Sequence, residues 1–369
     1  RKFALENAAY FDVVHKASTK ISLRYGFRIN QFLRFKQNGL NRYLNDNPVT
    51  FDQELGIYKE AEIIGDYLNP DNSKTIKSFY NFEPRFNLSY NFKNQSIKAS
   101  YNRLNQYIHL ISNTNAPAPL DIWAPSGPYL KPQQLDQLVI GYHSKLKNSN
   151  KLETEVFYKK IKNRLDYIPG ADLVANAAVE RILLAGKARA YGLEFLFKKN
   201  KGRHNYWLAY TISKSEQKTN GRNSVETGIN MGKWYNTGYD KTHDFSFVSN
   251  FKLNKKLTFN TNFIFQTGQP TNYPVGQYTY MNLTIPNYGE RNSNRLPNYH
   301  RLDISLTLVP NKNKKRDYKS EWVFGIYNIY NRENANSITF QQNEKTLKNE
   351  AIQLSIFGIV PSISYNFKF

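Results

Sequence analysis

The segment from Ser362 to Phe369 constrains the fold most strongly, because its residues alternate strictly between polar and apolar. Successive side chains of a β-strand point to opposite faces, so this pattern predicts a strand with one polar and one apolar face. The apolar face consists of Ile363, Tyr365, Phe367 and Phe369. We expect this strand to be the last one of a sheet, and an ordinary edge strand is the alternative interpretation.

The same alternation recurs along the chain and predicts about thirteen strands. Polar stretches with Asn, Asp, Pro and Gly separate them, which indicates turns and loops. The predicted strands are 7–14, 21–30, 84–92, 96–111, 135–145, 152–168, 190–198, 205–215, 243–253, 257–266, 301–308, 321–330 and 351–369.

The connections between these segments alternate between short and long. The short ones are rich in Lys and Asn, and they are 16–19, 93–95, 147–151, 200–202, 254–256 and 311–317. Outer-membrane barrels have short periplasmic turns and long extracellular loops, and their strands of about ten residues cross the bilayer at a tilt. The sequence therefore predicts an all-β fold, a transmembrane antiparallel up-and-down β-barrel.

The composition agrees with this fold and excludes others. Aromatic residues make up 15% of the 369 residues and favour pleated, half-buried surfaces. No run of about 18 apolar residues occurs, which excludes a membrane protein built from helices. The absence of Cys excludes disulfides and thiolate metal sites.

The net charge of +22 raises the question of an anionic partner. Lys and Arg are spread over short turns and alternate strand positions and do not form one patch, so we expect no nucleic acid. Anionic lipid headgroups or an anionic solute fit this distribution better.

Closure of the barrel sets a further expectation. Lipid offers no partner for backbone N–H and C=O groups, so an open sheet cannot span a membrane. We therefore expect residues 1–369 to be the C-terminal portion of one transmembrane β-barrel domain. The missing strands would belong to the same gene product or to a separate chain. If both barrel ends lie in the periplasm, the strand count puts Arg1 in an extracellular loop.

Stretches spread over nearly the whole chain carry a resemblance to a known family. They are ENAAYFDVV, LRYGFRIN, FEPRFNLSYNF, YNRLNQYIHLISNT, LDIWAPS, LKPQQLDQLVIGY, EVFYKKIKNRLDYIPGA, ARAYGLEFLFKK, WLAYTISKSE, FQTGQPTNYP, GIYNIYNRENA and VPSISYNFKF. In this order they resemble the barrel of TonB-dependent outer-membrane transporters, of the kind common in Bacteroidetes.

The resemblance implies a barrel of about 22 strands, filled by an N-terminal plug domain. The plug would engage TonB, and proton-motive energy would drive uptake of a large, scarce nutrient. The plug, the TonB-binding segment and about nine of those strands are absent from this sequence. The barrel-assembly machinery would read an aromatic C-terminal strand, matched here by Tyr365, Phe367 and Phe369. Outer-membrane lipid, lipopolysaccharide and a surface lipoprotein are further expected partners.

No catalytic or metal-binding constellation stands out, so we expect neither an enzyme nor a cofactor. The six His residues are not spaced as metal ligands, and no nucleophile or phosphate-binding motif occurs. Glu153 and Glu155 form an i, i+2 pair that we interpret as lining a polar lumen. Arg24, Arg28 and Arg85 also lie on polar strand faces, and we interpret them as partners of plug carboxylates because buried charges require pairing.

Solute recognition would lie on the long outer loops. Aromatic side chains near Asn and Gln suit sugars or peptides, and the candidates are Trp123, Tyr129, Trp234, Tyr235, Tyr273, Tyr278 and Tyr280. The alternative is that these side chains belong to the aromatic girdle at headgroup level or pack the loops together.

Three functions stay open on these grounds. The leading hypothesis is energised uptake by an integral protein of the bacterial outer membrane. The alternatives are a passive porin and a structural barrel subunit of a larger surface assembly. An upstream plug would separate transporter from porin, and co-purifying lipoproteins without an uptake defect on deletion would favour the structural subunit.

Overall fold

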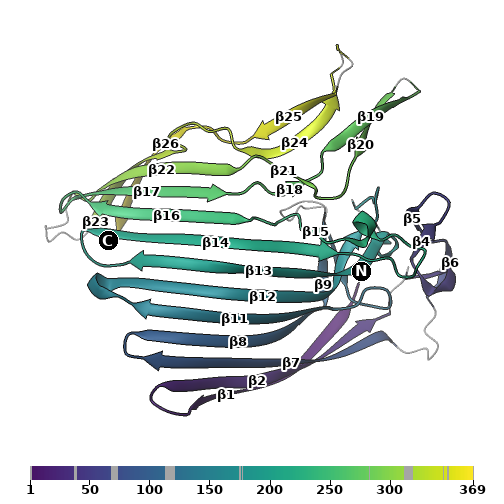
Figure 1. Cartoon of the computed structure of the whole chain (residues 1–369), viewed down its shortest axis with the longest axis horizontal. Coiled ribbons are helices and arrows are strands. Elements are labelled where there is room, and N and C mark those ends of the chain that lie inside the picture. Colours follow the sequence, from purple (N-terminus) through teal and green to yellow (C-terminus); the bar gives the residue numbers. More distant parts are fainter. Residues whose placement is uncertain are drawn as a thin grey trace.

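One large antiparallel sheet dominates the protein. The computed structural model describes residues 2–36, 40–67, 74–112, 121–173, 176, 178–281, 283–310, 319–343, 345–346 and 349–368. Within these residues the sheet has 14 strands, and neighbours in the sheet follow one another along the chain (Figure 1). The strands are β1 (Ala4–Lys16), β2 (Ile21–Phe35), β7 (Thr75–Phe92), β8 (Gln95–Gln106), β11 (Gln133–Lys145), β12 (Asn150–Tyr167), β13 (Leu183–Lys199), β14 (His204–Lys218), β16 (His243–Lys252), β17 (Leu257–Gln266), β22 (Tyr299–Leu308), β23 (Lys319–Tyr327) and β26 (Val360–Lys368), with β15 (Tyr235–Asn236) beside β14. The predicted all-β antiparallel architecture is confirmed.

Smaller elements fill the long connections, and one of them, η2 (Lys147–Ser149), lies in the short turn between β11 and β12. They pair as two-stranded sheets or form single 3₁₀ turns. The pairs are β3 (Asn41–Tyr43) with β6 (Ile63–Asp66), β4 (Val49–Asp52) with β5 (Ile57–Glu60), β9 (Ile108–Ile111) with β10 (Ile122–Pro125), β18 (Pro270–Thr271) with β21 (Asn294–Arg295), β19 (Pro274–Tyr280) with β20 (Leu283–Tyr288), and β24 (Ala335–Gln342) with β25 (Asn349–Ser355). The 3₁₀ turns are η1 (Leu44–Asp46), η2 (Lys147–Ser149), η3 (Val179–Ile182) and η4 (Ile229–Gly232). No helix in the described residues is long and apolar enough to cross a membrane.

Short and long connections lie at opposite ends of the sheet. Figure 1 shows the tight turns at the left and the long connections with their hairpins at the right. β1 begins at the right-hand end, where Ala4 pairs with Arg34, and β26 ends at the left. Arg1, which we expected in an extracellular loop, lies outside the described residues. Among the described residues, β1 pairs only with β2 and β26 only with β23, so both edges of the sheet are open.

The outer face of the sheet is apolar and exposed. Directly paired residues share a face, and one such row contains Ile140 of β11, Val156 of β12 and Leu193 of β13. Their side chains are 63%, 55% and 39% exposed. An exposed apolar surface that continues across neighbouring strands promotes aggregation in water, but the lipid-facing side of a membrane barrel requires one.

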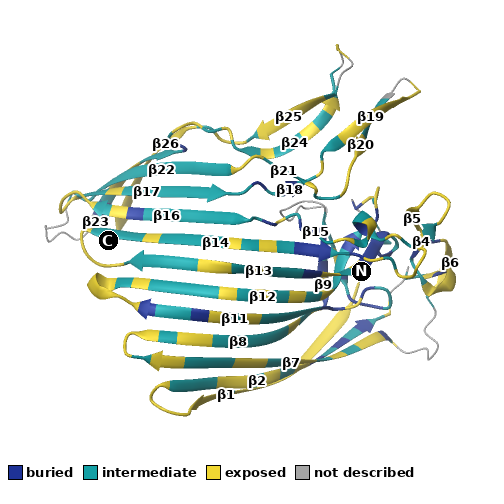
Figure 2. Ribbon diagram, viewed as in Figure 1, coloured by how far each residue is buried: buried dark blue, intermediate teal, exposed yellow. Residues whose placement is uncertain are grey.

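The buried core lies at one end of the molecule and not along the sheet. Figure 2 shows the buried residues gathered at the end with the long connections. The core cluster is formed by Val49, Tyr58, Ile111, Ala124, Leu130, Ile168, Leu173, Val179, Ile182, Leu183, Leu184, Ile229 and Tyr235. We call the described parts of 40–67, 107–132, 168–184 and 219–240 the cap.

Several predicted boundaries were wrong; for example, β2 ends at Phe35 and not at residue 30, and β13 begins at Leu183 and not at residue 190. The segment 96–111 is two strands, because the chain leaves the large sheet after Gln106 and β9 pairs with β10 instead. The segment 351–369 is likewise divided between β25, in an outer hairpin, and β26. The third strand begins at Thr75 and not at residue 84. Alternation continues through a strand that changes its partner, so periodicity alone does not detect such breaks.

Candidate functional site

A β-bulge at Asn163 decides which side chains of β12 reach the inside of the sheet. Asn163 has a φ of 55°, and the register shifts there, so that Lys162 pairs with Lys187 but Arg164 pairs with Gly186. Asn tolerates this left-handed conformation better than most residues. One extra residue moves everything beyond it to the opposite face. Arg164 and Asp166 therefore lie on the inner face, whereas without the bulge they would follow Lys162 on the outer face.

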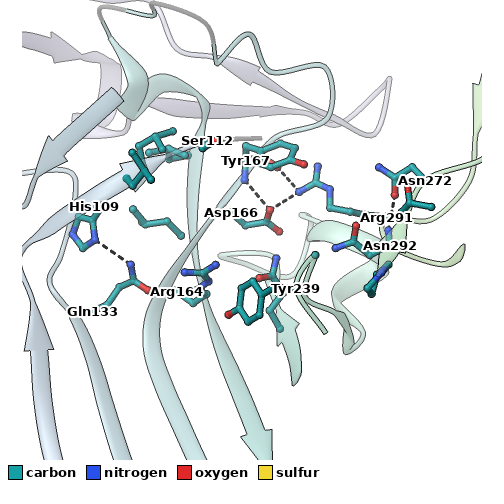
Figure 3. A pocket seen from close by; sticks show the side chains of 18 residues that line it. His109, Ser112, Gln133, Arg164, Asp166, Tyr167, Tyr239, Asn272, Arg291 and Asn292 are labelled. Carbon is teal, nitrogen blue, oxygen red and sulfur yellow. Dashed lines mark hydrogen bonds and ion pairs between the residues drawn. The ribbon is translucent and has the colours of Figure 1, made fainter. Parts of the chain in front are cut away.

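Beyond the bulge, the inner face opens into a cavity of about 310 Å³ beside the cap (Figure 3). Strands β9, β11, β12 and β14 and the loop around residue 291 contribute to its wall. Its polar and aromatic lining residues are His109, Ser112, Gln133, Arg164, Asp166, Tyr167, Gln217, Tyr239, Thr271, Asn272, Arg291 and Asn292.

A buried ion pair forms one side of the cavity. Arg291 donates through Nη1 to Oδ1 of Asp166 at 2.5 Å and to the backbone oxygen of Tyr167 at 2.8 Å. Its guanidinium lies 4.1 Å from the centre of the Tyr167 ring. The side chains of Asp166 and Arg291 are only 3% and 10% exposed. This pair fastens the loop that carries Arg291 to the end of β12.

Asp166 is satisfied by other donors as well. Tyr235 donates its hydroxyl to Oδ2 of Asp166, and Thr219 donates to the same oxygen at 3.3 Å. Gln217 donates to the Tyr235 hydroxyl at 3.0 Å. Burial and the charge of Asp166 both raise the pKa of Tyr235, so it stays a protonated donor. The carboxylate is thus fully used by the protein and leaves no acceptor for a solute.

Arg164 differs, because its charge is not compensated. Among the described residues, its buried Nε has no hydrogen-bond partner and no carboxylate lies within ion-pair distance of the side chain. The guanidinium lies 5.9 Å from the centre of the Tyr239 ring. Since Asp166 neutralises Arg291, the lining keeps one net positive charge, on Arg164. An anionic group in the cavity would supply the missing partner.

His109 lies close to this cation and is held neutral. Burial and the charge of Arg164 lower the pKa of His109 to about 4. Gln133 donates to its Nδ1 at 3.0 Å, so Nε2 carries the proton and donates to Ser126 at 3.0 Å. The His109 side chain therefore adds hydrogen bonding but no charge to this wall.

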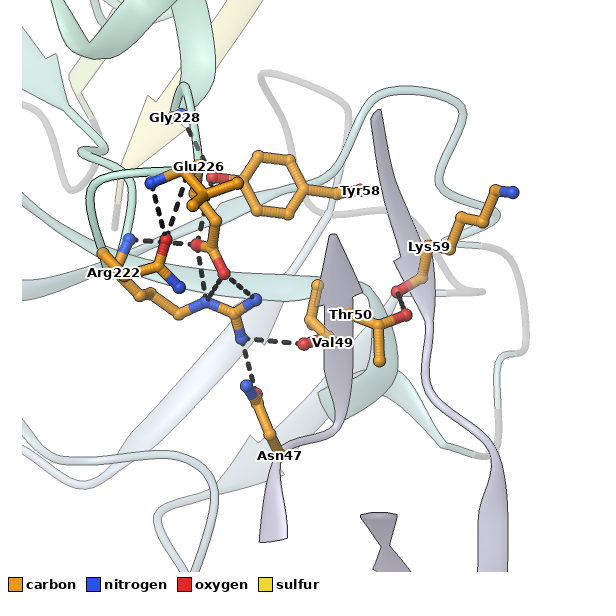
Figure 4. Close-up of polar contacts among 10 residues, drawn as sticks. Asn47, Val49, Thr50, Tyr58, Lys59, Arg222, Glu226 and Gly228 are labelled. Atoms are coloured by element: carbon orange, nitrogen blue, oxygen red, sulfur yellow. Dashed lines mark hydrogen bonds and ion pairs between the residues drawn. The ribbon is translucent and has the colours of Figure 1, made fainter. Parts of the chain in front are cut away.

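A second polar network holds the cap together (Figure 4). Arg222 donates to both carboxylate oxygens of Glu226 at 2.6 and 2.8 Å, and to the backbone oxygen of Val49 at 2.7 Å. Tyr58 donates to Glu226 at 3.4 Å and accepts from the backbone N–H of Gly228 at 3.1 Å. The hairpin of β4 and β5 is thereby tied to the connection between β14 and β15.

The seven aromatic residues predicted to bind solute are not brought together. Tyr235 is buried behind Asp166, and Tyr129 donates to Asp46 at 3.0 Å and packs edge-on against Tyr43. Both serve packing within the cap region. Trp123 on β10 is 62% exposed and does not line the cavity.

The other four lie elsewhere on the long-connection side. Trp234 lies over Arg189 on the outer side of the wall, at 4.2 Å from ring centre to guanidinium. Tyr273 packs edge-on against Phe340. Tyr278 and Tyr280 are exposed on β19. Solute binding by these residues and its alternative, loop packing or a girdle position, both stay predictions.

The five charged residues predicted to line the lumen lie on the polar face, with partners in the wall itself. Arg24 pairs with Asp12 at 2.7 Å, Arg28 with Glu6 at 2.9 Å, and Arg85 with Glu83 at 3.9 Å, as ion pairs. Glu153 pairs with Lys198 at 2.7 Å, and Glu155 lies 3.5 Å from His143. These charges are spread along the strands and do not form one site.

The C-terminal aromatic residues lie on the outer face. Tyr365 pairs across the strands with Trp322, and the two ring centres are 4.6 Å apart. Phe367 continues the same face and is 59% exposed. Phe369 lies outside the described residues.

Sequence reasoning missed the residues that form the cavity, above all Arg164, Tyr239 and Arg291. The available signal was Asn163, a residue suited to a bulge, in the run Lys162-Asn163-Arg164 at the end of a strand. Arg291 lies far away in sequence and offered no local signal.

Comparisons with known proteins agree with the fold. A family model described as "TonB dependent receptor-like, beta-barrel" matches residues 6–329. No curated protein is detectably similar in sequence. Among solved structures, the chain is similar to the ferric-catecholate import receptor Fiu from K12 E. coli, with a TM-score of 0.57 and 15% identity over 99% of this chain and 44% of that chain.

Two further structures are similar at the level of the fold. They are the outer-membrane ferripyoverdine receptor of Pseudomonas aeruginosa (TM-score 0.58, 12% identity, 98% of this chain and 38% of that chain) and the ferric yersiniabactin uptake receptor FyuA from Yersinia pestis (TM-score 0.58, 12% identity, 99% and 46%). The chain thus spans less than half the length of these structures. Because the family model covers most of the chain, the chain belongs to the TonB dependent receptor-like β-barrel family, whose members are integral proteins of the outer membrane.

Proposed function

We propose that this chain forms the wall and outer cavity of an energised transporter that takes up a large anionic solute across the outer membrane. One observation carries the proposal: the cavity at the long-connection end has an uncompensated cation, Arg164, with aromatic and amide groups around it. A binding site at the outer end of a barrel wall suits capture of a solute from outside. The protein would act as a carrier and not as an enzyme.

An anionic chelate fits this chemistry. The similar structures are named for ferric-catecholate, ferripyoverdine and ferric yersiniabactin. A ferric catecholate complex carries net negative charge and ring faces, and the cavity offers Arg164 for the charge and Tyr239 for stacking. Asn272 and Asn292 add amide groups to the same lining.

The open edges of the sheet support a larger barrel. Each unpaired backbone N–H or C=O group in lipid costs several kcal/mol. A sheet with exposed edges at β1 and β26 would therefore be unstable in a membrane. We propose that residues 1–369 are the C-terminal portion of a barrel of about 22 strands, completed by strands outside this sequence. Mass spectrometry of the intact polypeptide from its native membrane tests this, and a barrel closed by these strands alone would contradict it.

The expected partners follow from that arrangement. A plug would occupy the lumen and reach TonB, and the wall ion pairs of Arg24, Arg28 and Arg85 would rearrange to meet plug carboxylates. The barrel-assembly machinery would read the strand with Tyr365, Phe367 and Phe369. A surface lipoprotein would dock on the long-connection side.

Binding to the complete barrel in detergent tests the site, with iron(III) tris-catecholate as the probe. Arg164→Gln should weaken binding roughly tenfold to a hundredfold, because a hydrogen bond to a charged group is lost. Arg203→Gln removes the same charge at a tight turn between β13 and β14 and should leave binding unchanged. Equal affinity of both variants would contradict the assignment of the cavity.

Uptake by cells tests the energised mechanism separately. Deletion of the gene should abolish uptake of the iron probe, and so should a protonophore. Uptake that persists with the protonophore would indicate a passive porin. Unchanged uptake after deletion, together with loss of a surface partner, would indicate a structural subunit.

A further inference from the structure

The five tight turns that the structure describes form a strongly basic end of the molecule. They are the segments 16–20, 93–95, 145–151, 198–203 and 252–256, and Figure 1 shows the tight turns together at the left. These segments contain 13 Lys and Arg residues and no Asp or Glu. By contrast, the segment 40–67 at the opposite end contains six Asp and Glu residues and two Lys and Arg residues. We call the five segments the basic rim.

A cavity of about 270 Å³, which we call the rim cavity, lies between two neighbouring turns of the basic rim. The turn after β7 and the turn after β11 enclose it, since β8 pairs with β11. Lys93, Lys98, Lys145 and Lys151 line the rim cavity together with neutral polar side chains, and all four lysines are exposed. Ammonium groups and neutral donors in one lining suit the oxygens of an anion.

The charge of these four lysines is not compensated. Within the part of the chain that the structure describes, no carboxylate lies within ion-pair distance of them, and Glu153, which also lines the rim cavity, pairs with Lys198 at 2.7 Å. Lys145 lies directly opposite Lys151, and Lys151 directly opposite Lys198, so three cations form one cross-strand row. Like charges directly opposite each other destabilise a sheet. An anion from outside the wall would relieve this repulsion.

The backbone of Lys93 points to the same conclusion. Its φ is 51°, a left-handed conformation that Gly and Asn adopt most easily. In the turn after β11, Asn148 has this conformation, with a φ of 58°. The geometry of the turn therefore does not explain a lysine at residue 93, and the property that distinguishes this residue is its charge.

The row of lysines lies on the face that points away from lipid. Val156 lies on the outer face, and Lys151 is an odd number of residues away on the same strand, so Lys151 and its row lie on the inner face. The outer face beside the turn after β7 is aromatic, because Tyr90 stacks with Phe92 at 5.6 Å between ring centres. Tyr side chains mark the headgroup level of a bilayer. Lipid headgroups thus meet an aromatic surface here, and the row is directed toward the mouth of the barrel.

We propose that the basic rim binds peptidoglycan, a polymer whose peptide side chains carry free carboxylates, and that one such carboxylate enters the rim cavity. The short turns of outer-membrane barrels lie in the periplasm, which holds this polymer. Neighbouring strands are about 4.8 Å apart, so adjacent turns lie about 10 Å apart. A polymer with carboxylates at regular intervals meets several turns at once, whereas a small anion meets only one. The proposal depends on the basic rim and not on the solute cavity at the other end.

Co-sedimentation of the complete barrel in detergent with purified peptidoglycan sacculi tests this. The triple variant Lys93→Gln/Lys145→Gln/Lys151→Gln should bind sacculi roughly tenfold more weakly, because three exposed ion pairs are lost. The control Lys160→Gln/Lys162→Gln/Lys187→Gln removes three exposed lysines from the other end of the wall and should bind as the unchanged protein does. Heat-modifiable migration on gels verifies that both variants are folded barrels.

Three further measurements separate the carboxylate polymer from other anions. Sacculi whose carboxylates have been converted to amides should bind the unchanged protein at least about tenfold more weakly. Short-chain phosphatidylglycerol should not displace the barrel from sacculi, and cells with the triple variant should take up iron(III) tris-catecholate at the unchanged rate.

Several results would overturn the proposal. Absence of binding by the complete barrel would show that another part of the protein already neutralises the basic rim. Equal binding of amidated sacculi, or an equal loss in the two triple variants, would show that the lysines of the rim cavity recognise no carboxylate. Displacement by phosphatidylglycerol would assign the basic rim to lipid, and slower uptake with unchanged sacculus binding would assign it to the solute path.

Discussion

Asp166→Ala tests whether the buried ion pair holds the loop of Arg291 against the wall. The substitution leaves the Arg291 guanidinium with the backbone oxygen of Tyr167 and the Tyr167 ring, but without a carboxylate. Removing one partner of a buried ion pair lowers stability by about 3–5 kcal/mol, because the other charge stays buried without a partner. Because the contacts to Tyr167 remain, we take the lower end, about 3 kcal/mol, as the loss in local stability.

Hydrogen exchange measured by mass spectrometry reports this loss directly. The backbone N–H groups of Arg291 and Asn292 donate to Asn230 at 2.9 Å and to Asn272 at 2.6 Å, so they exchange only when the loop opens. Since 1.4 kcal/mol corresponds to about a factor of ten, their exchange should accelerate roughly a hundredfold. Peptides from β13 should be unaffected, because the wall strands do not depend on this pair.

A double variant and a control make the reasoning refutable. In Asp166→Ala/Arg291→Ala, the loss in local stability of the loop should be smaller than the sum of the losses in the two single variants, because the double variant leaves no unpaired buried charge. Asp12→Ala breaks only the exposed ion pair with Arg24 and should change nothing in this loop. Strict additivity, or an Asp166→Ala rate within about twofold of the unchanged protein, would refute the argument.

Three other perturbations have defined outcomes. Deletion of Asn163 should return Arg164 to the outer face, so that binding of iron(III) tris-catecholate falls about as far as in Arg164→Gln; unchanged binding would contradict the role of the bulge. The pKa of His109 is about 4 when folded and 6.5 ordinarily, so the unfolded state takes up the proton first and cap stability, complete above pH 6.5, should fall as the pH drops toward 4. Exchange of residues 108–111 should accelerate across that window, and His109→Gln should remove this pH dependence. Tyr58→Phe loses its hydrogen bonds to Glu226 and Gly228, which costs about 1 kcal/mol, and proteolysis of the β4–β5 hairpin should quicken about fivefold; a rate that does not change would count against this network.

The wall was predictable from the sequence because its information is local. In Ile21 to Ile29 and again in Ser362 to Phe367, the parity of a position decides whether its side chain faces lipid or the inside, and the structure confirms these faces. The short turns are equally local, since Asn148 supplies the left-handed conformation that a tight turn needs. The start of a strand at Thr75, the bulge at Asn163 and the points where a strand changes partner, as after Gln106, escaped this reasoning.

The cap was not predictable in the same way, because contacts between distant segments form it. Tyr43 donates to Glu180 at 2.9 Å, and Arg291 meets Asp166, across more than a hundred residues in each case. No periodicity relates such residues. The contact of Tyr129 with Tyr43 is of the same kind, because it joins two loop segments that are far apart in sequence.

The wall lies in lipid and the cap in water, and this difference explains why the wall can be predicted from local alternation and the cap cannot. The wall exposes its apolar side chains, such as Ile140, because lipid covers them, and it needs no buried core of its own. The cap stands in water and must bury apolar side chains such as Ile182, which requires segments far apart in sequence to pack together. Asn163 lies close to the boundary between the wall and the cap. Arg164 and Asp166, which follow Asn163, lie on the inner face, and Arg164 brings a positive charge to the cavity. Lys160 and Lys162, which precede Asn163 on the same strand, lie on the outer face.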